Sequence, residues 1–323
     1  MRTVPALLLS AAALTLAACS SGGNDDTPLA PPVDPATLCV DSGCGSKTVL
    51  LTIPSAENIL FTPQGRLFVS GGTNVFEISR DGDGYTATPL YEGSGNFTGL
   101  ARIGDVLYAN CFDGQLYAAR LTARPQLQPI HDLGLAAPNG LVDGPDGELY
   151  LANGPIPIGA LPDPKIVRLR LDPQDPLRVV EQTDWFTANL LGPNGVQRHG
   201  RRLYVSNTGL GGLAEIRTVE ITADGSAGAS EKLLSFIGLP DDFSLVGEHL
   251  LVANFLTGEI HFYSPRGNLI SSTAPLGFTS PSQVRVAQPP LFASTDILVT
   301  EKGLLGDNSS PIGNVLSVFR RSE

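Results

Sequence analysis

Four oxygen-bearing side chains stand at equivalent places in a pattern that repeats along the sequence. Glu57, Asn139, Asn194 and Asp241 each stand two positions before the first large apolar residue of a short strand-like run. If the copies form the innermost strands of one ring, these side chains converge on its axis. Carboxylate and amide oxygens suit a hard divalent ion, calcium first and magnesium or manganese second, whereas structural zinc prefers Cys and His. The four residues are therefore the candidate metal ligands.

Two of these candidates also have a simpler interpretation. Asn139 and Asn194 both stand in the triplet Pro-Asn-Gly, which is a strong turn former. Glu57 is a poor turn residue, yet it holds the same register, and Asp241 follows a proline with no glycine behind it. The set as a whole favours a metal site, while each Asn alone is compatible with a turn.

Two adjacent carboxylates are the candidates for proton transfer. A metal-polarised carbonyl needs a base that takes a proton from the attacking water. Asp242 is the more attractive base if Asp241 is a ligand of the ion, although the pair could equally be a ligand and its solvated neighbour. Asp241 and Asp242 are therefore both kept as candidate catalytic residues.

The repeat itself predicts the fold. Copies begin at residues 57, 98, 139, 194 and 241, and a weaker sixth begins near 282, so the spacing is 41 to 55 residues. Repeats of this length, built from short alternating strands and Gly-containing turns, indicate propeller blades. We expect an all-β, six-bladed β-propeller of four-stranded blades over residues 47–323. A spare strand at 47–53 is expected to close the ring beside the C-terminal strand, which removes an exposed edge.

The second strand of several copies ends in an asparagine near the expected mouth of the channel. The longest connections, between the second and third strands, lie on the same face, and such loops commonly carry binding sites. These asparagines are candidate contacts for substrate hydroxyls, with simple strand termination as the alternative. The residues are Asn110, Asn153, Asn207 and Asn254.

The N-terminal residues resemble a bacterial lipoprotein signal. An apolar run leads to Leu-Ala-Ala-Cys ending at Cys19, and the run is too short to span a bilayer. We expect residues 1–18 to be a signal peptide, and residues 19–46 to be a lipidated cysteine followed by a flexible Ser/Gly/Asp/Pro-rich tether. The protein would then be anchored by lipid to a membrane of the bacterial cell envelope, on its periplasmic or extracellular side.

The remaining cysteines and the net charge indicate the redox environment and the class of partner. Cys39 and Cys44 are close enough in sequence for a small disulfide loop in an oxidising compartment, and Cys111 is expected to be a buried thiol without a catalytic base. The formal net charge is −11, and no basic cluster is present, which disfavours nucleic acid as a partner. A monomer is expected.

At family level, the repeats resemble the gluconolactonase and regucalcin (senescence marker protein) superfamily and the related paraoxonases. The order Glu, Asn, Asn, Asp is similar to the paraoxonase ligand pattern. The resemblance implies a six-bladed propeller with calcium or another divalent ion in its channel, acting on lactones or esters. It rests on residues 55–59 (SAENI), 138–141 (PNGL), 145–150 (PDGELY), 193–196 (PNGV), 203–206 (LYVS) and 240–243 (PDDF).

The chain departs from the paraoxonase pattern at the histidines. Where a paraoxonase has a channel histidine in the second blade, this sequence reads Asn110-Cys111. The leading hypothesis is therefore a surface-anchored, divalent-metal-dependent hydrolase of lactones or small esters without a histidine dyad. The alternative is a non-catalytic propeller that binds a sugar, peptide or protein partner and holds its ion for structural reasons.

Overall fold

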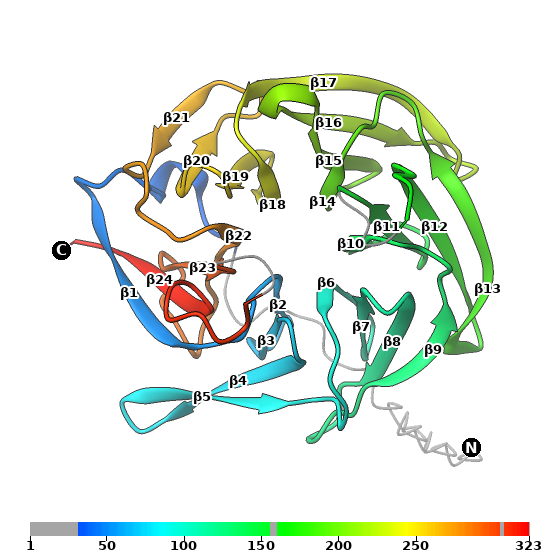
Figure 1. Cartoon of the computed structure of the whole chain (residues 1–323), viewed down its shortest axis with the longest axis horizontal. Helices are drawn as coiled ribbons and strands as arrows, with labels where there is room; N and C mark the ends of the chain where they lie inside the picture. The colour runs from blue at the N-terminus through cyan, green and yellow to red at the C-terminus, as the bar shows by residue number, and fades with distance from the viewer. Residues whose placement is uncertain (1–31, 156–159, 304–306, 323) are drawn as a thin grey trace, which may run out of the picture.

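Six four-stranded antiparallel sheets surround a common axis in the computed structural model (Figure 1). The structure describes residues 32–155, 160–303 and 307–322. Apart from two short 3-10 helices, η1 (Pro35–Thr37) and η2 (Leu210–Gly212), every regular element in these ranges is a strand. The predicted all-β, six-bladed propeller with four-stranded blades is confirmed.

Within blades one to five, consecutive strands pair as neighbours, from the innermost to the outermost. Their strands are β2 (Ile59–Phe61), β3 (Leu67–Ser70), β4 (Val75–Asp81) and β5 (Gly84–Pro89); β6 (Phe97–Ile103), β7 (Val106–Cys111), β8 (Gln115–Arg120) and β9 (Gln128–Asp132); β10 (Pro138–Asp143), β11 (Leu149–Asn153), β12 (Lys165–Asp172) and β13 (Asp175–Phe186); β14 (Pro193–His199), β15 (Arg202–Thr208), β16 (Leu213–Ile221) and β17 (Ala227–Ile237); and β18 (Pro240–Val246), β19 (His249–Asn254), β20 (Glu259–Tyr263) and β21 (Leu269–Ser272).

The sixth blade is built from both ends of the chain. β22 (Pro281–Val286), β23 (Ile297–Glu301) and β24 (Val315–Arg321) supply three strands, and β1 (Gly45–Thr52) pairs antiparallel with β24 as the fourth. The predicted closure of the ring by an N-terminal strand beside the C-terminal strand is therefore confirmed. The pairing covers the β24 edge, which would otherwise offer unpaired backbone groups.

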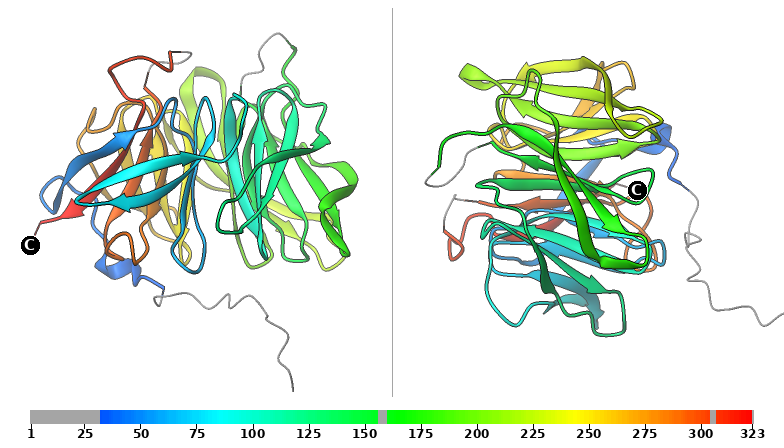
Figure 2. Two further views of the ribbon diagram at one scale, coloured as in Figure 1. Left: turned by 90° about the horizontal axis from the view of Figure 1, so that it is seen from below. Right: turned by 90° about the vertical axis from the view of Figure 1, so that its right-hand side faces the viewer.

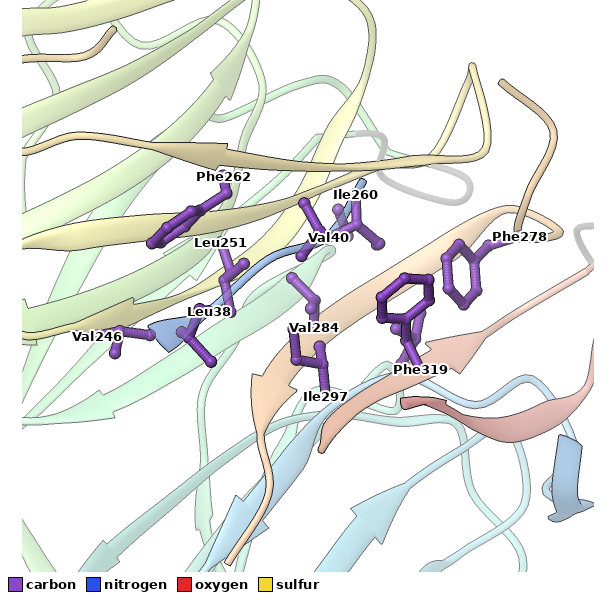
Figure 3. Packing of buried hydrophobic residues seen from close by; sticks show 12 residues of the cluster. Leu38, Val40, Val246, Leu251, Ile260, Phe262, Phe278, Val284, Ile297 and Phe319 are labelled. Carbon is purple, nitrogen blue, oxygen red and sulfur yellow. The ribbon is translucent and has the colours of Figure 1, made fainter. Parts of the chain in front are cut away.

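A distinct apolar cluster fills each junction between neighbouring blades. Figure 3 shows the junction between blades five and six, where Phe262 and Leu251 face Val284 and Ile297. Because strands in these sheets are covered on both faces, their inner halves are apolar on both sides. The innermost strands line the axis, and each has a buried polar side chain near its first residue.

The innermost strands of blades two to six begin with an irregularity in the ladder. In each, a register shift follows the first paired residue, so one or two residues are displaced from the ladder. A bulge of this kind re-aims side chains. The displaced positions begin at Thr98, Asn139, Asn194, Asp241 and Ser282, which are the leading residues of the sequence repeat.

Glycine follows the leading residue in blades two to four because the next blade lies against it. A Cβ on Gly99 or Gly140 would overlap the backbone of the following innermost strand, and one on Gly195 would overlap the Asp242 side chain. The glycines therefore set how closely the blades approach at the axis.

Replacement of Gly195 by alanine is expected to lower the free energy of unfolding by about 1–3 kcal/mol, the usual cost of overpacking. Gly84→Ala is the matched control, because Gly84 lies in β5 and a Cβ there meets only the Asp81 carbonyl oxygen at 3.6 Å. Urea unfolding of both variants measures the difference. Equal stabilities of the two variants would contradict the close approach of β14 to β18.

The segment before β1 packs on the propeller. Leu38 and Val40 are buried against blades five and six (Figure 3), and Cys39 and Cys44 are joined by a disulfide. β1 also begins at residue 45. The expected tether to residue 46 is thus too long at its C-terminal end, since residues 34–44 include η1 and buried apolar side chains. Residues 1–31, with Cys19 and the signal peptide, lie outside the described residues.

The two faces of the ring differ. Figure 2 shows η1 on one face and residues 307–314, which lead into β24, on the opposite face. Pro281 at the start of β22 pairs with Glu301 at the end of β23, so the innermost strand begins on this second face. We call this second face the mouth face. Among the described residues, no helix has the length and apolar character needed to cross a bilayer.

Candidate functional site

One buried side chain from each blade forms a layer just inside the mouth face. All six are largely withdrawn from solvent; Glu57 is 3% exposed and Asp241 is 8% exposed. Five are fixed by the bulges described above, and Glu57 is held because its backbone nitrogen donates to the Ser70 carbonyl oxygen at 2.9 Å. We call this set the mouth layer: Glu57, Thr98, Asn139, Asn194, Asp241 and Ser282.

Ser282 joins the two acids of the mouth layer. Its hydroxyl oxygen lies 2.5 Å from Asp241 Oδ2 and within hydrogen-bond distance of Glu57 Oε2. A hydroxyl carries a single hydrogen and can donate to only one of two carboxylates. The second contact therefore requires either a proton on one acid or a shared cation. Sequence reasoning placed Ser282 in the repeat but did not select it as a site residue.

The two amides differ in how closely they approach the acids. Asn194 lies beside Asp241, where its hydrogen bond lowers the pKa of that carboxyl, and its own Oδ1 is buried without a partner. Asn139 donates from Nδ2 to the Gly154 carbonyl oxygen at 3.2 Å. Glu57, Asp241 and Asn194 are thus joined by direct contacts, whereas Asn139 occupies the equivalent place in the adjoining blade.

A lysine that the sequence analysis did not single out also reaches the mouth layer. Lys302 begins the β23–β24 connection, and its Nζ forms an ion pair with Glu57 Oε1. The lysine side chain is only 12% exposed. Burial lowers the pKa of Lys302 to about 7, but the carboxylate in contact favours the ammonium form. Within the part of the chain that the structure describes, Glu57 is the only acid paired with Lys302.

The pKa of Asp241 is raised to about 7. The largest cause is burial, and the neighbouring Asp242 charge adds to it, while hydrogen bonds from Ser282 and Asn194 act in the opposite direction. A protonated Asp241 also satisfies the hydrogen count at Ser282, since the acid donates to the hydroxyl and the hydroxyl donates to Glu57. The metal-free mouth layer then holds one carboxylate, one ammonium and one neutral acid.

The raised pKa gives a prediction for the metal-free protein. Folding favours the protonated form of Asp241, so its contribution to stability is full below the unfolded pKa near 4 and is lost as pH rises through about 7. Between about pH 5 and about pH 8, chelator-treated wild type should lose a few kcal/mol more stability than Asp241→Asn, at about 1.4 kcal/mol per pKa unit. Urea unfolding at the two pH values measures this, and parallel behaviour of the two proteins would contradict it.

The donors present fit a hard divalent ion. Two carboxylates, an unpartnered buried amide oxygen and a second amide from the adjoining blade are the oxygen ligands that calcium or magnesium takes. No group of three or more His, Cys, Asp and Glu side chains suited to a metal occurs in the described ranges, which is consistent with a site made half of amides.

Asp242 occupies a second layer, one step deeper along the axis. Asp242 Oδ1 accepts from Gln197 Nε2 at 3.1 Å and from the Phe243 backbone nitrogen at 2.7 Å. Asp242 Oδ2 accepts from Asn58 Nδ2 at 3.1 Å and from Gln283 Nε2 at 2.9 Å. A carboxylate has about four acceptor positions, so this side chain is saturated. We call Asn58, Gln197, Asp242 and Gln283 the polar hub.

Arg285 contacts the hub, because its Nη2 donates to Gln197 Oε1 at 3.4 Å. Burial lowers the pKa of Arg285, and the charges of Asp242 and Asp143 oppose that effect. Burial also raises the pKa of Asp242 to about 6, while its hydrogen bonds and Arg285 pull it down. Because its acceptors are filled by groups from blades one, four and six, Asp242 holds the ring together, and Asp241 is the better placed of the two candidate bases.

The four asparagines predicted to contact substrate are engaged with the protein itself. Asn153, Asn207 and Asn254 each accept a backbone N–H from the loop that enters their own blade, at Ala137, at Leu191 and Gly192, and at Leu239 respectively. These bonds tie each innermost strand to its neighbour. The Oδ1 atoms of these three asparagines are therefore used within the protein, and the contact of their side chains with substrate hydroxyls stays a prediction.

Asn110 is not equivalent to the other three. Phe97 pairs with Cys111, whereas Pro138 pairs with Asn153, so the prediction was one residue out of register in blade two. Cys111 Sγ accepts a hydrogen bond from the Asn96 backbone N–H at 3.3 Å. In blades three to five, an asparagine Oδ1 accepts the equivalent hydrogen bond. Asn110 instead donates to Thr98 Oγ1 at 2.7 Å and to the Asn139 carbonyl oxygen at 2.8 Å.

Neither Cys111 nor any of the four histidines is a member of the mouth layer. Cys111 is buried and free, and burial raises its pKa to about 11, so the thiolate is strongly disfavoured. His131 and His261 lie on β9 and β20, and His199 and His249 lie at the face opposite the mouth. Within the described ranges, no histidine belongs to the mouth layer.

Known structures of the same fold include both enzymes and other proteins. Gluconolactonase XC5397 from Xanthomonas campestris matches with a TM-score of 0.65 and 20% identity, over 94% of this chain and 99% of that chain. Regucalcin from Agrobacterium tumefaciens, described as a calcium-binding protein, matches with a TM-score of 0.65 and 17% identity, over 86% and 94%. A chain of a nidogen–laminin complex matches with a TM-score of 0.55 and 15% identity, over 72% and 84%.

The structural neighbours include gluconolactonase-like and regucalcin-like proteins. The predicted resemblance is confirmed at the level of the fold. No protein-family model matches the chain. No curated protein matches it either.

Proposed function

We propose that the protein is a divalent-metal-dependent hydrolase of lactones or small esters, with its active site at the mouth layer. The observation that carries the proposal is the chain of contacts from Glu57 through Ser282 to Asp241 and Asn194, which ends in a buried amide oxygen without a partner. Such an oxygen is costly to bury unless a ligand or ion completes it. Calcium is the first candidate, with magnesium or manganese second.

The ion would be held by Glu57, Asn139, Asn194 and Asp241. When bound, it supplies Lewis-acid polarisation of the substrate carbonyl and stabilises the developing oxyanion. Asp241 is the proposed site of proton transfer through the carboxylate oxygen that does not bind the ion, because its acceptors are not saturated as those of Asp242 are. Ser282 fixes the orientation of Asp241 through the 2.5 Å contact.

The proposal extends to the location of the protein. Cys19 and the preceding apolar run support lipid anchorage in the bacterial cell envelope. η1 and the segment before β1 lie on the face opposite the mouth (Figure 2), so the anchored chain would leave the mouth accessible. The proposed hydrolase is a monomer that acts on a small-molecule substrate.

The alternative function is a non-catalytic binding module whose ion is structural. It is favoured by exposed apolar side chains around the mouth face, which are uncommon on a surface that meets only water when they gather in one region. They lie in loops and strand ends there: Leu191, Leu210, Leu213, Ile237, Leu256 and Leu276.

A substrate screen separates these functions. Lactones and aryl esters are offered to the protein lacking residues 1–31, with chelator and after restoring calcium, magnesium or manganese. The proposal expects turnover that the chelator removes and one of the ions restores, and it expects none from Asp241→Asn. Tight binding of an ion without turnover of any substrate would contradict the hydrolase proposal and favour the non-catalytic binding module.

A further inference from the structure

We infer that Lys302 is a built-in cation that neutralises Glu57 when no ion is bound, and that a divalent ion must displace it to bind. This inference rests on the proposed ion site at the mouth layer. It assigns a role to a lysine that the hydrolytic mechanism does not use.

The first support is the pairing itself. Glu57 is 3% exposed, and Lys302 is its only ion-pair partner among the described residues. The other Glu57 oxygen is taken by the Ser282 hydroxyl. A buried carboxylate without a compensating cation is strongly unfavourable. The Lys302 ammonium therefore offsets the free-energy cost of burying the Glu57 charge when no ion is bound.

The second support is the singular placement of this lysine in the repeat. Lys302 directly follows Glu301, and Glu301 occupies the register position of Cys111, Asn153, Asn207 and Asn254. None of the residues that follow those four positions is basic: they are Phe112, Gly154, Thr208 and Phe255. The ammonium is therefore a local addition beside Glu57 and not a general feature of the blades.

The third support is charge balance. A dication and an ammonium together would bring three positive charges to two carboxylates, Glu57 and Asp241, in a buried place. The excess charge has no acid to pair with it in the mouth layer, where the other members are neutral. Binding of the ion therefore requires Lys302 to leave Glu57, and its unbranched side chain, which is 12% exposed, would have to turn its ammonium toward solvent.

Calcium titration of Lys302→Met tests the inference. Calorimetry and thermal unfolding are carried out on chelator-treated wild type and variant. We expect calcium to bind the variant at least tenfold more tightly, and to raise its melting temperature by more than in wild type, because the metal-free variant has an unpaired Glu57. The binding measurement does not depend on any enzymatic activity.

Lys47→Met is the matched control. Lys47 Nζ pairs with Glu301 Oε2 at 2.7 Å, and Glu301 is 1% exposed, but this pair lies outside the mouth layer. The Lys47→Met variant should be less stable than wild type, because Glu301 then lacks its cation. It should keep the wild-type calcium affinity. If Lys302→Met does not fold without metal, refolding in graded calcium gives the same comparison of apparent affinity with Lys47→Met.

The outcomes separate the inference from the proposed function. Calcium binding that is equal in wild type and Lys302→Met, or weaker in the variant, would overturn displacement while leaving the ion site intact. Binding by the variant alone would support displacement and contradict ion use by wild type under those conditions. Absence of binding in both would overturn both proposals.

Discussion

Asp242→Asn is expected to lower the free energy of unfolding by about 3–5 kcal/mol, the usual cost of removing one partner from a buried charged network. The Asp242 carboxylate fills its acceptors with Asn58, Gln197, Gln283 and a backbone N–H. An asparagine amide would direct N–H groups at side-chain amides that already donate. It would also leave Arg285 without its main compensating charge.

Asp146→Asn is the control for this substitution. Asp146 pairs with Arg201 at 3.0 Å, but both side chains are well exposed, so this substitution should leave the stability nearly unchanged. Combining Asp242→Asn with Arg285→Met should recover part of the loss, because the unpaired guanidinium is removed. A variant as stable as wild type that has lost all turnover would instead make Asp242 the catalytic base.

Glu57→Gln is expected to lower the affinity for the divalent ion at least about 100-fold, more than a supporting residue usually contributes, and to abolish turnover at ordinary ion concentrations. The substitution removes one of only two anionic donors in the mouth layer and keeps the shape of the side chain. It also leaves Lys302 buried without a partner. The metal-free variant should therefore be less stable than wild type.

Glu148→Gln is the matched control for Glu57→Gln. Glu148 is also a buried acid, and it accepts from Tyr150 Oη at 3.0 Å and from the Asp146 backbone nitrogen at 3.1 Å. It should lose stability without losing ion affinity. Wild-type affinity and turnover in Glu57→Gln, measured by calorimetry and by the substrate screen, would remove Glu57 from the site.

The six-bladed architecture could be predicted because each copy of the repeat marks where its own strands begin and end. A polar leading residue, an apolar strand, a glycine turn and a second apolar strand recur six times, and each copy is a local signal that does not depend on distant contacts. The closing strand was predictable for a related reason, since the sixth copy ends on its third strand and the N-terminal strand had no other partner. The error in blade two arose where Cys111 replaces the asparagine that marks the strand end elsewhere.

The mouth layer could be predicted in part, because residues at one repeat position must meet at the axis of a closed ring. What lies between those positions could not. Lys302 lies in a different blade from Glu57 and contacts it only through its long side chain. The repeat pattern contains no information about this contact. The role of Asp242 depends on amides of three other blades at once. A signal was present in the sequence, since Asn58, Asp242 and Gln283 interrupt the series of glycines at this position.

The most direct test of the account is calorimetric titration of the chelator-treated, tether-free wild type with calcium, magnesium and manganese. We expect that one ion binds per chain in a saturable manner and raises the melting temperature, and that Glu57→Gln lowers the affinity at least about 100-fold and removes the rise in melting temperature at the same ion concentration. No saturable binding of any of the three ions, with an unchanged melting temperature, would contradict the claim that the mouth layer is an ion site.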